Sequence, residues 1–201
     1  NNTVSQNTIH SLSNTNASTT GHVTGIMYAS SSGTNLIERN FIHSLSASSA
    51  SAVINGIYIN SGTATYRNNM IRLGIDASGT LFATGCAING INETVAGTDN
   101  MYHNSVFIGG SGVSGSANTF AFQSSITTNT RNYVDNIFWN NRSNGAGTGK
   151  HYAIRVGGTA PNPSGLTSNY NDLFANGTGG LVGLFNAVDQ ATLAAWRTAT
   201  G

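Results

Sequence analysis

A six-residue pattern of apolar and polar positions occurs six times along the 201-residue chain. It consists of an apolar residue, two variable residues, an asparagine, one variable residue and a second apolar residue, as in residues 133–138. The sixth copy, residues 168–173, lacks the first apolar residue. The asparagines are Asn7, Asn40, Asn69, Asn104, Asn136 and Asn171, and the steps between them are 33, 29, 35, 32 and 35 residues. A fixed asparagine recurring at this spacing predicts a repeat architecture.

Each repeat also contains a second phrase, which usually opens with glycine. Its copies are residues 25–28, 56–59, 85–88, 119–122, 151–154 and 180–183. Apolar and polar residues alternate over these short runs, and Gly, Ser, Thr and Asn bound them, which is typical of strands. Each repeat therefore offers three short strands: one at the glycine phrase, one before the fixed asparagine and one after it.

Equivalent positions of the repeats form columns that predict the core. Two places after the fixed asparagine the residue is apolar in all six copies, and three places before it in five. These two columns are Ile9, Ile42, Ile71, Val106, Phe138, Leu173 and Val4, Ile37, Tyr66, Met101, Tyr133. In the glycine phrase we expect a third inward column of Ile26, Ile57, Cys86, Phe120 and Tyr152. Cys86, the only cysteine, is then a small buried hydrophobe.

Three short strands per repeat, joined by polar connections of varying length, predict an all-β fold. The specific expectation is a right-handed parallel β-helix, or solenoid, of about six coils with a short C-terminal helix. Residues 1–180 are expected to form the coils, and residues 181–201 a last partial coil with the helix. The helix is predicted within residues 188–197, with Asp189 as its N-cap and with Leu193 and Trp196 on one face. That face would cover the end of the stack.

The fixed asparagine is expected at a corner where two strands meet. Asparagine tolerates the left-handed backbone conformation and can bond to its own backbone. When asparagines stack on one another, the side-chain amide of each can donate to the amide oxygen in the next coil. The six fixed asparagines are therefore predicted to form a structural ladder.

The composition narrows the classes of function. Only 7% of the residues are charged, against about 25% in a typical soluble domain, while 38% are hydrophobic, which is enough for a core. The net charge of +1 gives no electrostatic reason to expect nucleic acid as a partner. No apolar run approaches the roughly 18 residues of a membrane-spanning helix, so membrane insertion is not expected. The charge-poor surface and the start at Asn1 without an initiator Met indicate a segment of a longer extracellular protein.

The two phrases resemble the coils of right-handed parallel β-helix proteins of the pectin-lyase-like group. The closing residues 170–174 and 193–201 resemble the ends of such regions in large bacterial surface proteins, many of them cargo of the type IX secretion pathway. This resemblance covers nearly the whole chain, and it implies a secreted or cell-surface bacterial location. The group contains lyases, hydrolases, adhesins and structural stalks, so the resemblance is specific for fold and not for activity.

Candidate catalytic residues are few. Lyases of this fold generally need carboxylates for calcium and a Lys or Arg as base, and the hydrolases use clustered aspartates. Stacking brings His103 within one coil of Asp135, which is either an acid–base pair or a solvent-exposed cross-strand pair. Lys150, the only lysine, lies close in sequence to Arg155, where a lyase-type base or an ordinary loop cation is expected. Glu38 lies one coil from Arg67 in the same way.

A column three places after the fixed asparagine is the candidate carbohydrate-binding surface. It ends in three aromatic residues on successive coils, Phe107, Trp139 and Phe174, which we expect to point outward. Such rings form a flat platform for sugar rings, unless a neighbouring loop covers them or a bulge turns them inward. His10 and His43 begin the same column, but two histidines without a third ligand are poor evidence for a metal. No metal and no cofactor are therefore expected.

These observations lead to one main hypothesis and two alternatives. The chain is predicted to be a non-catalytic structural or adhesive segment with weak carbohydrate binding. Its expected partners are a polysaccharide or another cell-surface glycan and other domains of the same longer chain. The alternatives are a polysaccharide lyase or glycoside hydrolase of this fold, and a subunit that stacks end to end through its open coil edges.

Overall fold

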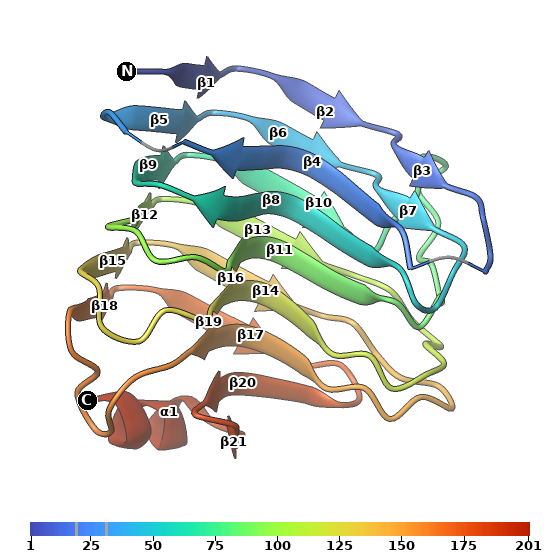
Figure 1. The fold of residues 1–201 in the computed structure, drawn as a ribbon. Helices are drawn as coiled ribbons and strands as arrows, with labels where there is room; N and C mark the ends of the chain where they lie inside the picture. Colours follow the sequence, from blue (N-terminus) through green and yellow to red (C-terminus); the bar gives the residue numbers. More distant parts are fainter. Residues whose placement is uncertain (19, 31) are drawn as a thin grey trace.

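The computed structural model describes residues 1–18, 20–30 and 32–201. The chain winds into a parallel β-solenoid of about six coils, and one short helix lies at its C-terminal end (Figure 1). Equivalent strands of successive coils pair in register and form three long parallel sheets. The all-β parallel solenoid expected from the repeats is therefore confirmed.

The first and second sheets contain the strands that flank the fixed asparagines. The first sheet consists of β1 (Thr3–Ser5), β5 (Asn35–Glu38), β9 (Ala64–Arg67), β12 (Asn100–Tyr102), β15 (Arg131–Val134) and β18 (Leu166–Asn169). The second consists of β2 (Thr8–His10), β6 (Phe41–His43), β10 (Met70–Leu73), β13 (Ser105–Ile108), β16 (Ile137–Asn140) and β19 (Asp172–Ala175). The short strands β3 (Ser13–Asn14) and β7 (Ser46–Ala47) pair separately.

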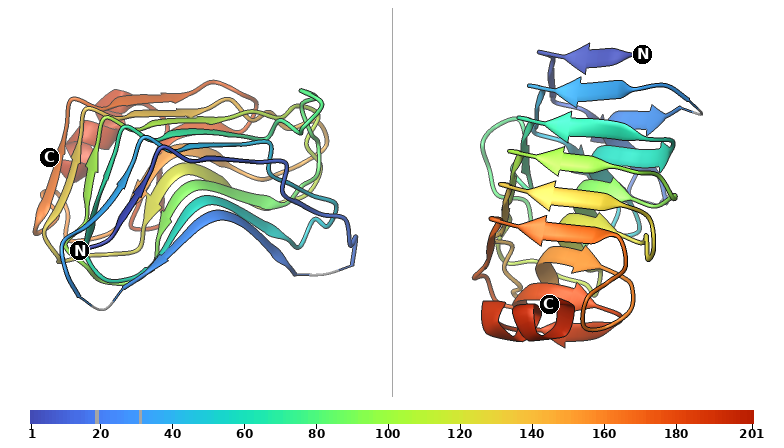
Figure 2. Two further views of the ribbon diagram at one scale, coloured as in Figure 1. Left: turned by 90° about the horizontal axis from the view of Figure 1, so that it is seen from above. Right: turned by 90° about the vertical axis from the view of Figure 1, so that its left-hand side faces the viewer.

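The third sheet contains the strands predicted from the glycine phrase. Its parallel strands are β4 (His22–Ala29), β8 (Val53–Ser61), β11 (Ala87–Glu93), β14 (Thr119–Ser124), β17 (His151–Val156) and β20 (Gly180–Phe185). The final strand, β21 (Val188–Gln190), pairs antiparallel with β20. Viewed along the stack, β4, β8 and β11 each bend toward the interior at mid-strand (Figure 2).

The corner between the first two sheets depends on two neighbouring residues of each repeat. The residue before each fixed asparagine, and not the asparagine itself, has the left-handed backbone conformation, with φ from 54° to 58°. These residues are Gln6, Arg39, Asn68, His103, Asp135 and Tyr170. The prediction that the asparagine adopts this conformation is therefore wrong. A single left-handed residue is enough to turn the chain, and the asparagine that follows directs its amide along the stack.

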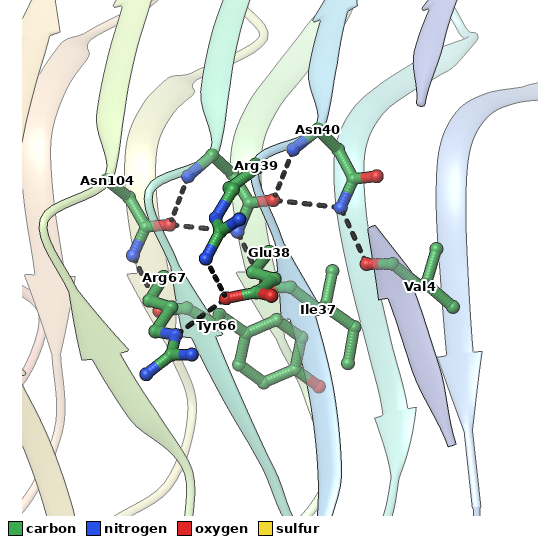
Figure 3. A network of polar contacts seen from close by, with 9 residues as sticks. Val4, Ile37, Glu38, Arg39, Asn40, Tyr66, Arg67 and Asn104 are labelled. Carbon is green, nitrogen blue, oxygen red and sulfur yellow. Dashed lines mark hydrogen bonds and ion pairs between the residues drawn. The ribbon is translucent and has the colours of Figure 1, made fainter. Parts of the chain in front are cut away.

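The asparagine ladder itself is confirmed. The backbone N–H and the side-chain Nδ2 of Asn40 both donate to Oδ1 of Asn69, at 3.1 and 3.0 Å (Figure 3). The second Nδ2 hydrogen of Asn40 donates to the carbonyl oxygen of Val4 in the preceding coil, at 3.0 Å. The amide contacts continue from Asn7 to Asn171. From Asn40 to Asn136 the steps thus satisfy buried donors that would otherwise cost about 1–3 kcal/mol each.

The apolar core fills the interior, but one predicted column is wrong. Ile57 pairs with Ile91, and Ile91 with Phe122, so Cys86 does not belong to that column although it is buried in the core as expected. Phe120 and Tyr152 pack against each other outside the core cluster. The glycine of the third coil that matches Gly56 is Gly90. A Cβ atom on Gly90 would lie 2.2 Å from Cγ1 of Val106, so only glycine allows this close approach between β11 and β13.

The C-terminal end is covered by β21 and by α1 (Leu193–Thr200). Thr192 and not Asp189 is the N-cap, because its hydroxyl accepts the backbone N–H of Ala195 and β21 occupies the residues before it. Trp196 is buried against Phe185, whereas Leu193 is exposed, so these two residues do not share a buried face. Within the described residues, no helix combines the length and the apolar character needed to cross a bilayer.

Candidate functional site

The bend of the third sheet creates a groove on its outer face. Where the strands turn inward, small residues are required. A Cβ atom on Gly56 would lie 2.7 Å from Cγ2 of Ile71 on the second sheet. The concave outer side opposite this contact holds a groove of about 500 Å³. We call it the outer groove, and its lining includes Asn55, Tyr58, Asn89, Asn92, Phe120, Gln123 and Arg155.

Side-chain hydrogen bonds connect successive coils along the floor of the outer groove. Nδ2 of Asn89 donates to Oδ1 of Asn55 at 2.9 Å, and Nε2 of Gln123 donates to Oδ1 of Asn89 at 3.0 Å. The guanidinium of Arg155 donates to Oε1 of Gln123 at 3.0 Å. Asn92 also donates to Asn55, at 3.1 Å. The floor is therefore a preorganised row of amides and one cation that spans four coils.

Phe120 lines the C-terminal part of the groove, and the buried ring of Tyr152 supports it from the next coil. The rings of Phe120 and Tyr152 stack 5.0 Å apart with an interplanar angle of 7°, and the guanidinium of Arg155 lies 5.8 Å from the Phe120 ring centroid. The Tyr152 hydroxyl donates to Oδ1 of Asp189 at 2.8 Å, and Lys150 forms an ion pair with the same carboxylate. The hydrogen bond from Lys150 lowers the pKa of Asp189 below its usual value. This end of the groove is held in place by β21.

The four candidate acid–base residues form two separate groups. Arg155 lines the outer groove and donates to Gln123, whereas Lys150 directly precedes β17 and pairs with Asp189. His103 and Asp135 lie at successive corners between the first and second sheets, with 3.9 Å between Nδ1 and Oδ2. Both of these side chains are about half exposed, so their interaction is worth less than about 1 kcal/mol. The structure does not bring the four residues into one site.

Glu38 and Arg67 also meet across neighbouring coils. Nε of Arg67 donates to Oε2 of Glu38 at 2.8 Å, and the guanidinium of Arg39 lies 3.8 Å from the same oxygen (Figure 3). The carboxylate is mostly buried, while both arginine side chains are about half exposed. The two arginines neutralise the carboxylate of Glu38 beside the corner, so this cluster is an ion-pair contact that links neighbouring coils.

The aromatic column lies on the outer face of the second sheet. Trp139 is 37% exposed and Phe174 is 47% exposed, so neither a bulge nor a loop hides them. The rings meet edge to face: Phe107 and Trp139 at 83°, and Trp139 and Phe174 at 72°. The indole N–H of Trp139 donates to Oδ1 of Asn176 at 3.3 Å. The column is therefore stepped and not flat, and each ring offers a small separate surface.

The histidines at the other end of this column are also stacked. The rings of His10 and His43 lie 5.0 Å apart and 4° from parallel, and each Nδ1 contacts the hydroxyl of the following serine. Burial, Arg72 and His10 lower the pKa of His43 below its usual value. In residues 1–18, 20–30 and 32–201, no three His, Cys, Asp or Glu side chains gather as metal ligands.

A buried hydrogen-bond chain behind the groove has the order of a catalytic triad. Oγ1 of Thr119 lies 2.9 Å from Nδ1 of His151, and Nε2 of His151 lies 2.9 Å from Oδ1 of Asn144. Nδ2 of Asn140 also donates to the Thr119 hydroxyl, at 2.9 Å. Burial lowers the pKa of His151 to about 4, which keeps the ring neutral at pH 7. Thr119 and His151 are both fully buried, so this chain ties coils together and does not meet a substrate.

The sequence analysis did not identify the outer groove or this buried chain. A usable signal was present, because the same three residues, asparagine, glycine and isoleucine, occur at 55–57 and again at 89–91. Aligning those two runs puts Asn55 beside Asn89, as in the observed register. Comparison of the chain with protein family models, curated proteins and solved structures found no match. The function proposed below is therefore inferred from the geometry of the surface.

Proposed function

We propose that this solenoid is a non-catalytic, adhesive and structural segment that binds carbohydrate in the outer groove. The observation that supports this most is the bent third sheet, whose concave face presents a row of fixed amides beside aromatic rings. Carbohydrate hydroxyl groups bond well to planar amides, and preorganised groups bind without a large loss of side-chain entropy. The groove runs across the coils, so its natural ligand is an extended oligosaccharide.

The partners of the charged residues support a binding role and not a catalytic one. A lyase-type base must be free to take a proton from the substrate. Lys150 forms an ion pair with Asp189, and the guanidinium of Arg155 is shared between Gln123 and the Phe120 ring. These contacts engage both cations within the protein, and Arg155, which lines the groove, favours ligands with acidic or hydroxyl groups.

The two ends of the stack are relevant to the alternative in which subunits stack end to end. Head-to-tail stacking requires free strand edges at both ends. At the C-terminal end, β21 reverses the strand direction and α1 places Trp196 over the interior. This covered end favours a solenoid that does not extend by stacking on a second copy. We place the column outside the cell, on a bacterial surface or in a secreted protein exported by the type IX pathway, because of its charge-poor, polar composition and its resemblance to such regions.

The test is retention by immobilised polysaccharides, with the soluble products analysed by mass spectrometry. The double variant Asn89→Ala with Gln123→Ala removes amides from the groove, and Trp139→Ala removes the central ring of the aromatic column. We expect the groove variant to lose retention at least tenfold and Trp139→Ala to retain most of it. The exposed change Asp172→Asn is the matched control. Loss of retention only in Trp139→Ala would move the site to the aromatic column, and shortened polysaccharide chains would show a lyase or hydrolase instead.

A further inference from the structure

Two carboxyl groups are buried inside the third coil. Glu93 ends β11 and Asp99 lies just before β12, and both residues are fully buried. Glu93 stands in an inward column whose neighbours are Ile59 and Ser124. An ionised carboxylate in such a place costs several kcal/mol unless hydrogen bonds or a counter-charge compensate it. The compensation at these two residues is incomplete.

One oxygen of each carboxyl group has a donor. The Tyr133 hydroxyl donates to Oε2 of Glu93 at 2.7 Å, and the backbone N–H of Ala64 donates to Oδ1 of Asp99 at 2.9 Å. The other two oxygens, Oε1 of Glu93 and Oδ2 of Asp99, lack a donor among the described residues. Besides burial, the charge of Glu93 and its contact with Asp99 both raise the pKa of Asp99, so the two carboxyl groups are close neighbours in the interior. Two facing acceptors without a donor are satisfied by a single proton between them.

The groups packed around this pair supply no cation to it. Tyr66 on β9 is fully buried with an unpartnered hydroxyl, and its ring meets Tyr28 on β4 edge to face at 5.8 Å. On β15, besides Tyr133, the charged residue is Arg131. Its guanidinium donates to the backbone carbonyls of residues 126, 129, 157 and 164. The surroundings are therefore three tyrosines and an arginine that already has its own acceptors.

The position of Asp99 in the coil also fits a protonated acid. Two coils earlier, the equivalent residue is Asn35, whose Oδ1 accepts the backbone N–H of Asn2 at 3.0 Å. Asp99 accepts the N–H of Ala64 in the same way. An asparagine amide has one acceptor oxygen and one donor group, and a protonated aspartic acid has the same two functions.

We propose that Glu93 and Asp99 share one proton between Oε1 and Oδ2, and that loss of this proton at alkaline pH loosens the third coil. Deprotonation leaves two negative charges close together in the interior, where, within the described part of the chain, Tyr66 is the one of the three tyrosines whose hydroxyl is not already donating. Asn92, the neighbour of Glu93, lines the outer groove, so the loosened strand is the one that supplies the groove's central amides. The proposal concerns the interior and does not depend on carbohydrate binding.

The direction of the pH dependence follows from linkage. Burial, followed by the charge of Glu93, raises the pKa of Asp99 to about 8. The folded pKa thus lies above the unfolded one of about 4, so the folded state binds the extra proton. The stabilisation is complete below about pH 4 and is lost as the pH rises through about 8. The effect of His151 lies mainly below pH 7. Burial raises the pKa of the Cys86 thiol, so the unfolded thiol ionises before the folded one as the pH approaches about 8.5, and this adds a loss of stability that the wild type and Asp99→Asn share.

The experiment compares wild-type protein with Asp99→Asn, Glu93→Gln and the exposed control Asp172→Asn. Urea unfolding is followed from pH 6.5 to 8.5, and proton release on unfolding at pH 7 is measured by calorimetry in buffers of different ionisation enthalpy. For the wild type and the control, we expect the folding constant to fall as the pH rises to 8, by up to about tenfold per pH unit. We also expect about one proton more to be released at pH 7 than from Asp99→Asn, whose folding constant keeps only the shallower pH dependence that His151 and Cys86 cause.

Three results would overturn the proposal. The first is an equal pH slope in wild type and Asp99→Asn. The second is a wild type whose stability rises with pH and with added Ca²⁺, which would put a cation in place of the proton. The third applies if neither Asp99→Asn nor Glu93→Gln folds: in that case proton release by the wild type decides, and a value near zero at pH 7 contradicts the shared proton.

Discussion

The asparagine ladder and the floor of the outer groove are both rows of side-chain amides that cross the coils, but they differ in composition. The ladder has asparagine in all six coils, and every step repeats the same bonds. In contrast, the position that Asn55 and Asn89 occupy on the groove floor is Thr24 in the first coil, Phe120 in the fourth and Tyr152 in the fifth. The ladder therefore has the same residue at the same position in every coil. At the groove floor the residue type differs between coils although the strand register is kept.

The two rows also differ in what their amides can do. Ladder amides from Asn40 to Asn136 are buried and have their hydrogen-bonding groups occupied by the protein. The groove amides are also largely buried, with only Gln123 partly exposed, but all of them line the groove and face its space. Removal of a ladder residue should therefore damage the fold, and removal of a groove residue should damage binding. The following predictions test this division.

The largest effect is expected from Asn104→Ala. Its Oδ1 accepts two hydrogen bonds from Asn69, and its Nδ2 donates to Asn136 and to the carbonyl of Tyr66. Loss of these bonds leaves buried groups unpaired, so the free energy of unfolding should fall by about 3 kcal/mol. Urea denaturation measures it, with the exposed Asn7→Ala as the control at below about 1 kcal/mol. Equal costs at the two sites would contradict a ladder stabilised by burial.

A pH effect of roughly 2 kcal/mol is expected from the buried chain behind the groove. The folded pKa of His151, about 4, lies below its ordinary value of 6.5 because the ring is buried. The unfolded state therefore binds the extra proton, and stability present above pH 6.5 is lost as the pH falls toward 4. Melting temperatures between pH 7 and pH 4 should show the loss in wild type and not in His151→Gln. An unchanged slope in that variant would place the ring in contact with solvent.

A smaller effect on stability is expected from Asn89→Ala. It removes one hydrogen bond to Asn55 and one from Gln123 at the groove floor, which together contribute about 1–2 kcal/mol. Calorimetry should show a small decrease in melting temperature together with a clear loss of glycan retention. If stability fell as much as in Asn104→Ala, the groove row would be a second structural ladder.

The smallest effect on stability is expected from Trp139→Ala. The ring is exposed on the second sheet and touches Phe107 and Phe174 by its edges. Its removal should cost less than about 1 kcal/mol, since such aromatic pairs contribute about that much. Thermal unfolding gives the value, and the fully buried Phe138→Ala, at about 3–5 kcal/mol, is the comparison. A similar drop for both variants would mean that the aromatic column belongs to the core.

The fold was predictable because coil-to-coil stacking imposes the same requirement at each step. Ile42 pairs with Ile71, and Ile71 with Val106, as the columns predicted. The third sheet was harder, because the third coil offers two glycine-led runs, at Gly85 and at Gly90. Only the packing of Gly90 against Val106 decides between them, and that contact joins distant parts of the chain. The Cys86 column failed for this reason.

The candidate site was less predictable than the fold. The column containing Trp139 was identified because strand alternation fixes which residues point outward. The outer groove depends on the inward bend of the third sheet, and a strand pattern of period 2 carries no information on such a bend. In the same way, the N-cap moved from Asp189 to Thr192 because pairing of β21 with β20 competes with the start of the helix.

The division between ladder and groove is tested most directly by NMR of the side-chain amides, with and without a panel of neutral and acidic oligosaccharides. The account predicts that a binding oligosaccharide shifts the amide signals of Asn89, Asn92 and Gln123 and leaves those of Asn40, Asn69 and Asn104 unchanged. Shifts confined to Trp139 and Asn176, or an absence of shifts at the groove amides for every sugar, would contradict it.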